Sequence, residues 1–241
     1  MTTFTPVSEA NLSEYLDQGY TILPNVFSPD EMATTIALVE EFDARRSAGI
    51  DGTEGKAQRF ATHLAEQDPE LRAFMAGPKL AAIATEFLGP DVDLYFNQSV
   101  FKGPEGNRIF PWHQDDAYGP VEPAGYLTLW LALNDATEEN GCISVLPGSH
   151  RAGLRAHVPT PHGLAGHAAD DPDQGIAAPV PAGTIIAFNS LTLHKSGPNT
   201  SKGERKALVL QYCAAGLKRA ETGEAIPDLI PVMRGGRAIE R

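Results

Sequence analysis

The chain has 241 residues, 42% of them hydrophobic and 21% charged, an ordinary balance for a globular protein with an ample core. Its formal net charge of −12, without a dense run of Lys or Arg, disfavours nucleic-acid binding and favours a small-molecule partner. No apolar run reaches the roughly 20 residues that span a bilayer, and the first residues lack the basic segment and apolar core of a secretory signal. We therefore expect no membrane partner and a cytoplasmic location.

The length exceeds that of the commonest single domains, but all-β barrels and sandwiches with attached helices often reach it as one unit. We expect one domain over residues 1–241, and the sequence leaves the oligomeric state open. Cys142 and Cys213 lie in apolar runs typical of strands. Buried free thiols are more common there than a bridge, which fits a reducing compartment.

Helical patterns dominate the first ninety residues. The segment SPDE at 28–31 combines a Ser N-cap, Pro at the first helical position and Glu three residues after the cap, and it predicts a helix to about residue 46. A second helical stretch begins at 68–69, is interrupted near 77–78 and ends at 89–90. We therefore expect a helical N-terminal part over about 1–90.

From Val92 onward the hydrophobic period changes to two. Short runs rich in β-branched, aromatic and leucine residues alternate with Gly, Pro and Asn clusters, and these runs are VDLYFNQSVF, YLTLWLAL, CISVL, TIIAF, SLTLH and KALVLQYC. They predict an antiparallel β core over about 91–215. Within YLTLWLAL the leucines share one face, which should pack, while Tyr126, Thr128, Trp130 and Ala132 share the other, which could line a cavity. Thr128 itself reads as an ordinary strand residue.

The segment 148–179 shows neither period. It is rich in Gly, Ala, Pro and His, which indicates a surface excursion or a lid rather than a linker between domains. Its histidines at 157, 162 and 167 are most simply solvated side chains.

His113 and Asp115 stand two positions apart in the stretch FPWHQDDAYGP. One such pair is expected by chance, since 7 × 31/241 is about one. On a strand, however, positions i and i+2 point to the same side, so both residues could bind one ion. His194, at the end of SLTLH, shares a face with Ser190 and Thr192 and is the candidate third ligand. Two imidazoles and one carboxylate leave three positions open, as in non-haem Fe(II) oxygenases, so the implied metal is iron.

Arg205 follows His194 after a turn and leads the strand KALVLQY. Its planar guanidinium could hold one end of a dicarboxylate at the far end of the cavity, because the fork matches carboxylate geometry.

The chain resembles the phytanoyl-CoA dioxygenase family of Fe(II)- and 2-oxoglutarate-dependent oxygenases, over most of residues 15–212. The matching elements are WHQD, LWLALNDATEENGCISVLPGSH, TLHKSGPN and Arg205. The resemblance implies a double-stranded β-helix, a jelly roll related to the cupins, with the N-terminal helices packed on one sheet. It also implies iron ligation by His113, Asp115 and His194, binding of the C5 carboxylate of 2-oxoglutarate by Arg205, and further co-substrate contacts from Gln98, Trp130 and Ser196.

The expected activity is therefore oxidation of a C–H bond in a small metabolite, such as a natural-product intermediate, with Fe(II), 2-oxoglutarate and O₂. Hydroxylation is preferred, with desaturation or cyclisation as variants, since Asp115 fills the place that related halogenases leave for chloride. A cupin-type metalloenzyme without 2-oxoglutarate would not need Arg205, and a non-catalytic jelly-roll binding module would not need the three ligands. Tyr118, Arg108 and His157 are the candidate substrate contacts.

Overall fold

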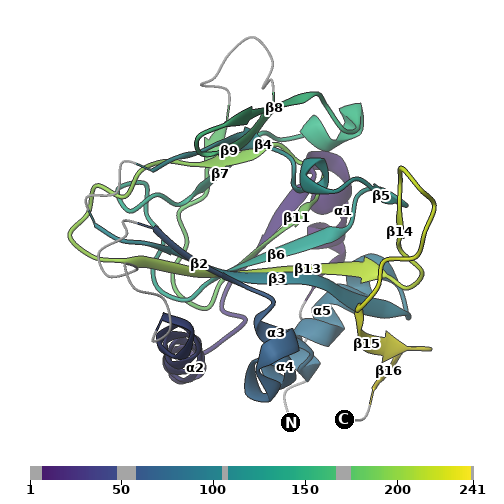
Figure 1. Cartoon of the computed structure of the whole chain (residues 1–241), viewed down its shortest axis with the longest axis horizontal. Coiled ribbons are helices and arrows are strands. Elements are labelled where there is room, and N and C mark those ends of the chain that lie inside the picture. The colour runs from purple at the N-terminus through teal and green to yellow at the C-terminus, as the bar shows by residue number, and fades with distance from the viewer. Residues whose placement is uncertain (1–6, 48–57, 105–107, 167–174, 240–241) are drawn as a thin grey trace.

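A long antiparallel sheet forms the base of the molecule in the computed structural model, which describes residues 7–47, 58–104, 108–166 and 175–239 (Figure 1). Its strands run in the order β1 (Tyr20–Leu23), β11 (Ile185–Asn189), β6 (Leu127–Ala132), β13 (Arg205–Ala214), β3 (Val92–Lys102), β15 (Ile230–Arg234) and β16 (Arg237–Ala238). Strand β2 (Gln58–Thr62) also pairs with β3. We call this the major sheet.

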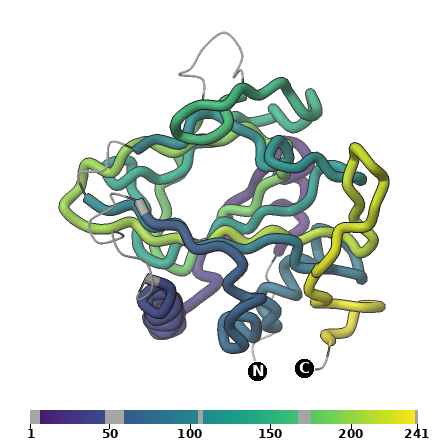
Figure 2. Tube along the Cα trace, in the orientation of Figure 1, coloured from purple at the N-terminus to yellow at the C-terminus, as the bar shows by residue number. Residues whose placement is uncertain are grey.

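A smaller antiparallel sheet lies over part of the major sheet (Figure 2). Its order is β10 (Ile176–Ala177), β7 (Ile143–Val145), β12 (His194–Ser196) and β4 (Phe110–His113). Two short antiparallel strand pairs complete the β structure, β8 (His157–Thr160) with β9 (Gly163–Gly166) and β5 (Val121–Glu122) with β14 (Lys218–Arg219). Two facing antiparallel sheets are what a double-stranded β-helix requires, so the predicted fold is confirmed.

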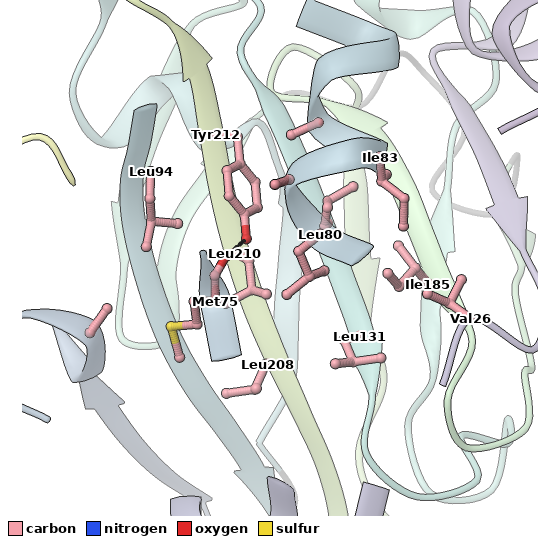
Figure 3. Close-up of a cluster of buried hydrophobic side chains, with 14 of the residues drawn as sticks. Val26, Met75, Leu80, Ile83, Leu94, Leu131, Ile185, Leu208, Leu210 and Tyr212 are labelled. Atoms are coloured by element: carbon pink, nitrogen blue, oxygen red, sulfur yellow. Dashed lines mark hydrogen bonds between the residues drawn. The ribbon is translucent and has the colours of Figure 1, made fainter. Parts of the chain in front are cut away.

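Alternation along the strands sorts the apolar residues into two cores. Leu131, Leu208 and Leu210 lie on the outer face of the major sheet and pack against the helices (Figure 3). Trp130 and Val209 lie on the inner face, between the two sheets. The predicted division of YLTLWLAL into a packing face and a cavity face is therefore confirmed.

The helices lie together on the outer face of the major sheet, except for α1 (Glu9–Gln18), which packs beside β1 and β11 (Figure 1). They are α2 (Pro29–Ser47), α3 (Leu64–Gln67), α4 (Pro69–Met75) and α5 (Pro78–Leu88). The predicted cap of α2 is present, because Ser28 N–H donates to Glu31 Oε2 at 2.8 Å and Glu31 N–H donates to Ser28 Oγ at 3.3 Å. Tyr212 fixes α4 to the sheet by donating its hydroxyl to the Met75 carbonyl.

Two strands lie within the mainly helical first ninety residues, and the sequence pattern did not predict them. β1 and β2 extend the major sheet, with Ile22 opposite Ile186 and Phe60 opposite Val100. Each strand has only 4 or 5 residues, and its conformation is set by a partner elsewhere in the chain rather than by its own period.

The run SLTLH was predicted as a strand, and this was wrong. Residues 190–193 form a turn, in which Leu191 N–H donates to Asn189 Oδ1 at 2.9 Å and Thr192 N–H donates to the Asn189 carbonyl at 2.7 Å. Strand β12 begins at His194 instead of ending there. Hydrogen bonds from an Asn side chain and backbone favour a turn over an extended strand.

The segment 148–179 contains more structure than its composition suggests. It forms a short 3₁₀ helix η2 (Ser149–Ala152), the β8–β9 pair and β10, while residues 167–174, including His167, lie outside the described residues. The β8–β9 pair lies beside β4 (Figure 2). Both cysteines are buried and free, as expected. Among the described residues, no helix has the length and hydropathy needed to cross a membrane.

Candidate active site

The structure brings His113, Asp115 and His194 together at one end of the space between the sheets. One donor atom from each residue lies within 4.8 Å of the other two. His113 ends β4 and His194 begins β12, and the two are direct cross-strand partners. The sequence predicted that Asp115 lies on the same strand as His113, and this was wrong. Asp115 is the first residue of the 3₁₀ helix η1 (Asp115–Tyr118). The turn still directs its carboxylate to the side that the histidines face.

Backbone hydrogen bonds orient both imidazoles. His113 Nδ1 lies 2.8 Å from the Pro111 carbonyl and His194 Nδ1 lies 3.0 Å from the Thr192 carbonyl, so each Nδ1 must carry the proton and donate it. Each Nε2 then presents a lone pair toward Asp115 Oδ1, at 3.9 Å from His113 and 3.5 Å from His194. Burial, followed by the neighbouring His194, lowers the pKa of His113 to about 3, which keeps the ring neutral. Neutral imidazoles with fixed tautomers are suited to metal ligation.

Thr128 orients the carboxylate. Its Oγ1 donates to Asp115 Oδ2 at 2.7 Å and leaves Oδ1 to face the two histidines. The donor set is therefore two imidazole nitrogens and one carboxylate oxygen. Each of the three side chains is oriented by a hydrogen bond between its other polar atom and the protein. This set fits a divalent iron with open positions on its other side.

Residues that are paired across neighbouring strands of the major sheet form rows, and these rows build the cavity wall next to the metal ligands. Gln98, Val209 and Trp130 are paired across β3, β13 and β6. Two rows away along β3 and β13, Lys102 is paired with Arg205. Because side chains two positions apart share a face, both rows point to the same side of the sheet.

A small inner cavity lies between the donor set and Arg205. The predicted co-substrate contacts Gln98, Trp130, Ser196 and Arg205 all line it, together with His113, Asp115 and His194. The structure thus brings all seven residues around one space, while their roles stay predictions.

Arg205 is 1% exposed and is poorly satisfied by the protein itself. Its Nε has no partner among the described residues, and its Nη1 reaches only the Val100 carbonyl, at 3.4 Å. The guanidinium lies 5.3 Å from the Trp130 ring. Burial lowers the pKa of Arg205 to about 10, which still leaves it charged. A buried cation in this state is strongly destabilising unless an anion joins it, so this end of the cavity suits a carboxylate.

Lys102 is a second buried cation at the same end, and the sequence analysis did not assign it. It is 2% exposed, and its Nζ donates to Ser196 Oγ at 2.7 Å and to the Gly197 carbonyl. Because an ammonium only donates, the Ser196 hydroxyl accepts this bond, and its own proton is free to point into the cavity. Alternation along VDLYFNQSVFK places Lys102 on the face of Gln98, which is the signal that could have found it.

A larger outer cavity of about 520 Å³ opens on the other side of the donor set. It shares Gln98, Phe110, His113 and Asp115 with the inner cavity, so the two spaces meet at the ligands. Tyr118, a candidate substrate contact, lines this outer cavity, and its hydroxyl accepts a hydrogen bond from Leu164 N–H at 3.1 Å.

The other two candidate substrate contacts are placed differently. Arg108 is exposed, and the described lining of neither cavity includes it. His157 accepts the Gln114 N–H at Nε2 (3.0 Å) and donates from Nδ1 to the Arg155 carbonyl (2.8 Å). Both of its ring nitrogens are therefore engaged within the protein, beside the ligand segment. His162 lines the outer cavity instead.

The N-terminal segment braces the turn that precedes His194. The Gly19 carbonyl accepts hydrogen bonds from Thr192 Oγ1 at 2.7 Å and from Asn189 N–H at 2.9 Å. Gly19 has a φ of +81°, and a Cβ there would lie 2.5 Å from Thr192 Oγ1. The position therefore requires glycine for both conformation and space.

Comparison with known proteins identifies the family. The family model of phytanoyl-CoA dioxygenase (PhyH) matches residues 15–207. The chain is 30% identical over 223 residues to the "Probable alpha-ketoglutarate-dependent hypophosphite dioxygenase" of Stutzerimonas stutzeri, covering 84% of this chain and 77% of that protein.

Two solved structures share both fold and sequence with the chain. EvdO2 from Micromonospora carbonacea var. aurantiaca, complexed with 2-oxoglutarate, has a TM-score of 0.75 and 26% identity, covering 92% of this chain and 95% of that one. SnoK, a non-heme alpha ketoglutarate dependent carbocyclase from nogalamycin biosynthesis, has a TM-score of 0.79 and 25% identity, covering 94% and 97%. These likenesses favour the oxygenase over a cupin without 2-oxoglutarate and over a binding module. This chain therefore belongs to the phytanoyl-CoA dioxygenase family and is a 2-oxoglutarate-dependent non-haem iron dioxygenase.

Proposed function

We propose that this enzyme oxidises a C–H bond of a small molecule, with Fe(II) held by His113, Asp115 and His194 and with the C5 carboxylate of 2-oxoglutarate held by Arg205. The observation that carries the proposal is the pairing of a three-donor set with a buried, unpaired guanidinium across one small cavity. Bound iron would supply O₂ activation, in which one oxygen atom enters succinate and the other serves the oxidation of the substrate, with release of CO₂.

The protein groups fix the geometry of this reaction. Arg205 binds and orients the far carboxylate of the co-substrate, and Ser196 donates its free proton to the same group. Gln98 and Trp130 form the cavity wall between that end and the ligands. Thr128 keeps Asp115 from rotating, so one side of the metal stays open to 2-oxoglutarate and O₂.

Natural-product intermediates are the substrates that we favour, since the chain resembles a carbocyclase from nogalamycin biosynthesis over nearly its whole length. Hydroxylation is the preferred outcome, with cyclisation or desaturation as variants. We also propose that the chain is one domain that acts in the cytoplasm, without nucleic acid or membrane partners. Its net charge of −12 and its two free buried thiols support this.

The test is anaerobic titration of Fe(II) and then 2-oxoglutarate, followed by the metal-to-ligand charge-transfer absorption, with succinate measured after O₂ is added. We expect one Fe(II) per chain, and we expect His113→Ala and Asp115→Ala to lose it, because either change leaves an incomplete set. His63→Asn, at an exposed histidine outside the site, is the control and should retain full binding. Full iron occupancy in both ligand variants, or no charge-transfer band in the wild type, would refute the proposal.

A further inference from the structure

The outer cavity indicates which substrates this enzyme accepts, and this inference rests on the proposed function. If 2-oxoglutarate occupies the inner cavity beside Arg205, the substrate must reach the metal from the opposite side, where the outer cavity meets His113 and Asp115. Its volume of about 520 Å³ lies within the range of small-molecule sites. It is the space that a substrate would fill.

Aromatic rings dominate the described walls of this cavity. They come from β2, β3, β4, η1 and the residue before β6, and they are Phe60, Tyr95, Phe96, Phe110, Tyr118 and Tyr126. Two edge-to-face pairs organise them, Tyr95 with Tyr126 at 5.0 Å and Phe60 with Phe110 at 5.4 Å between ring centroids. Rings arranged in this way favour a flat, ring-containing ligand over a flexible chain.

Two buried polar side chains in the cavity have no hydrogen-bond partner among the described residues. Gln211 is 6% exposed and Tyr126 is 5% exposed, and both line the cavity. Gln211 lies on β13 opposite Thr128, the residue that holds Asp115, so its amide faces the space next to the ligands. Since both groups line the cavity, each can bond a ligand that brings carbonyl or hydroxyl oxygens, and a ligand that leaves them unpaired binds less tightly.

No charged group in the described lining could neutralise an anionic substrate. Apart from Asp115, the described lining contains no Lys, Arg, Asp or Glu, and besides the tyrosines its polar residues are Thr62, Gln98, His113, His162 and Gln211. The two buried cations, Lys102 and Arg205, lie in the other direction, at the end of the inner cavity. In the enzyme loaded with Fe(II) and 2-oxoglutarate, a carboxylate or phosphate in the outer cavity would therefore meet no positively charged side chain of the described lining, which is unfavourable.

We propose that the outer cavity binds an uncharged, ring-containing molecule that carries carbonyl or hydroxyl groups, with its rings between the Phe60–Phe110 and Tyr95–Tyr126 pairs and an oxygen bonded by Gln211 or Tyr126. Substrates that would place a carboxylate or a phosphate inside the cavity are disfavoured by the same chemistry.

The experiment compares two probes that share one ring system and differ in charge, 2-acetylnaphthalene and 2-naphthoate. Each is titrated by calorimetry into the anaerobic Fe(II)–2-oxoglutarate enzyme and into the metal-free protein. We expect the ketone to bind at least tenfold more tightly than the carboxylate in the loaded enzyme, and to perturb the charge-transfer band. Equal affinities, tighter binding of the carboxylate or no binding of the ketone would each overturn the proposal.

Two variants locate the probe. Tyr126→Phe keeps the ring and removes the hydroxyl, and it should weaken ketone binding about fivefold, whereas Tyr20→Phe, outside the cavity, should not. Phe60→Lys adds a cation at a partly exposed wall position and should reverse the preference toward 2-naphthoate, whereas Leu16→Lys, on the exposed face of α1, should leave it unchanged. If neither Tyr126→Phe nor Phe60→Lys changes the affinity for the ketone, the probe binds outside the cavity and the assignment is overturned.

Failure of the proposed function and failure of the proposed substrate class give different results in these measurements. If no charge-transfer band forms, the proposed function fails, whatever the probes do. If the band forms and the probes fail to discriminate, only the substrate class fails.

Discussion

Arg205 and Lys102 are directly opposite each other on neighbouring strands, both buried and both cationic. Like charges in this position repel, and burial adds a desolvation cost to each of them. Within the described part of the chain, neither has a carboxylate partner. The site therefore carries a local instability that a bound dianion would relieve.

Replacing Arg205 should separate co-substrate binding from metal binding. We expect Arg205→Ala to keep Fe(II) but to raise the 2-oxoglutarate concentration at half-saturation of the charge-transfer band about a hundredfold or more, since hydrogen bonds to charged groups contribute roughly 1.5–3 kcal/mol each. Arg205→Lys should restore only part of the affinity, because an ammonium lacks the planar fork. An unchanged midpoint in the alanine variant would remove Arg205 from the site.

Lys102 should make the stability of the ligand-free protein depend on pH. Burial, and then the neighbouring Arg205, lowers its pKa from 10.5 to about 7. Between these two values the unfolded chain binds more protons than the folded one, so the free energy of unfolding rises as pH increases from about 7 toward 10. Below pH 7 the buried ammonium is charged in both states, and its full cost remains.

Lys102→Met should remove this cost. We expect the variant to be more stable than the wild type at pH 6, with a flatter profile from pH 6 to 9.5 in urea unfolding of the metal-free protein. Lys218→Met, at an exposed lysine of β14, should leave the profile as it is. A variant that is less stable at pH 6 would show that the hydrogen bonds of Lys102 outweigh its desolvation.

At the scale of elements, the β8–β9 pair is a small unit that packs against β4. Each strand has 4 residues, and most of them are exposed or half-buried. Tyr118, from the turn that carries Asp115, holds this pair through Leu164. The pair thus lies at the rim of the outer cavity, linked to the ligand-bearing turn through Tyr118 and Leu164 and to the residue before Asp115 through His157 and Gln114.

Amide exchange should reveal the mobility of this pair. We expect residues 157–166 to exchange much faster than β7 and β12, because short exposed strands open locally, and to slow when the outer cavity is filled. Tyr118→Phe should speed exchange at Leu164, while Tyr20→Phe should not. Protection in the free enzyme equal to that of β12 would argue against a lid.

Elements with a local signal could be predicted from the sequence, and those set by distant partners could not. The Ser28 cap fixes the start of α2 within four residues, and alternation alone assigns Trp130 to the inner face. β1, by contrast, is a strand because it pairs with β11, more than 160 residues later. Thr128 was read as an ordinary strand residue because its hydrogen bond to Asp115 depends on a turn that the pattern does not specify.

At the scale of the whole molecule, residues from both ends of the sequence meet behind the metal ligands. Gly19 holds Thr192, and the Thr192 carbonyl orients the His194 ring. Gly19, between α1 and β1, thus takes part in positioning a ligand that lies 175 residues later in the chain.

Gly19→Ala should weaken metal binding from outside the site. The added Cβ meets Thr192 Oγ1 and the left-handed backbone is strained, so we expect Fe(II) affinity to fall about tenfold and stability by about 1 kcal/mol or more. Gly216→Ala is the matched control, since its φ is +92° but nothing lies within 4 Å of its Cβ position. It should lose similar stability while keeping the metal affinity of the wild type.

The two faces of the major sheet have separate tasks. The outer face packs against α2, α4 and α5, and the inner face lines the cavities beside the metal ligands with residues such as Gln98, Trp130 and Arg205. Successive residues on a strand point to opposite faces, so neighbouring positions in the sequence are selected for different properties, stability on one face and activity on the other. Mutations at outer-face positions change the stability of the protein, and mutations at inner-face positions change its substrate or activity. A lineage built on this sheet can therefore acquire new chemistry one codon at a time, without first rebuilding the support beneath it.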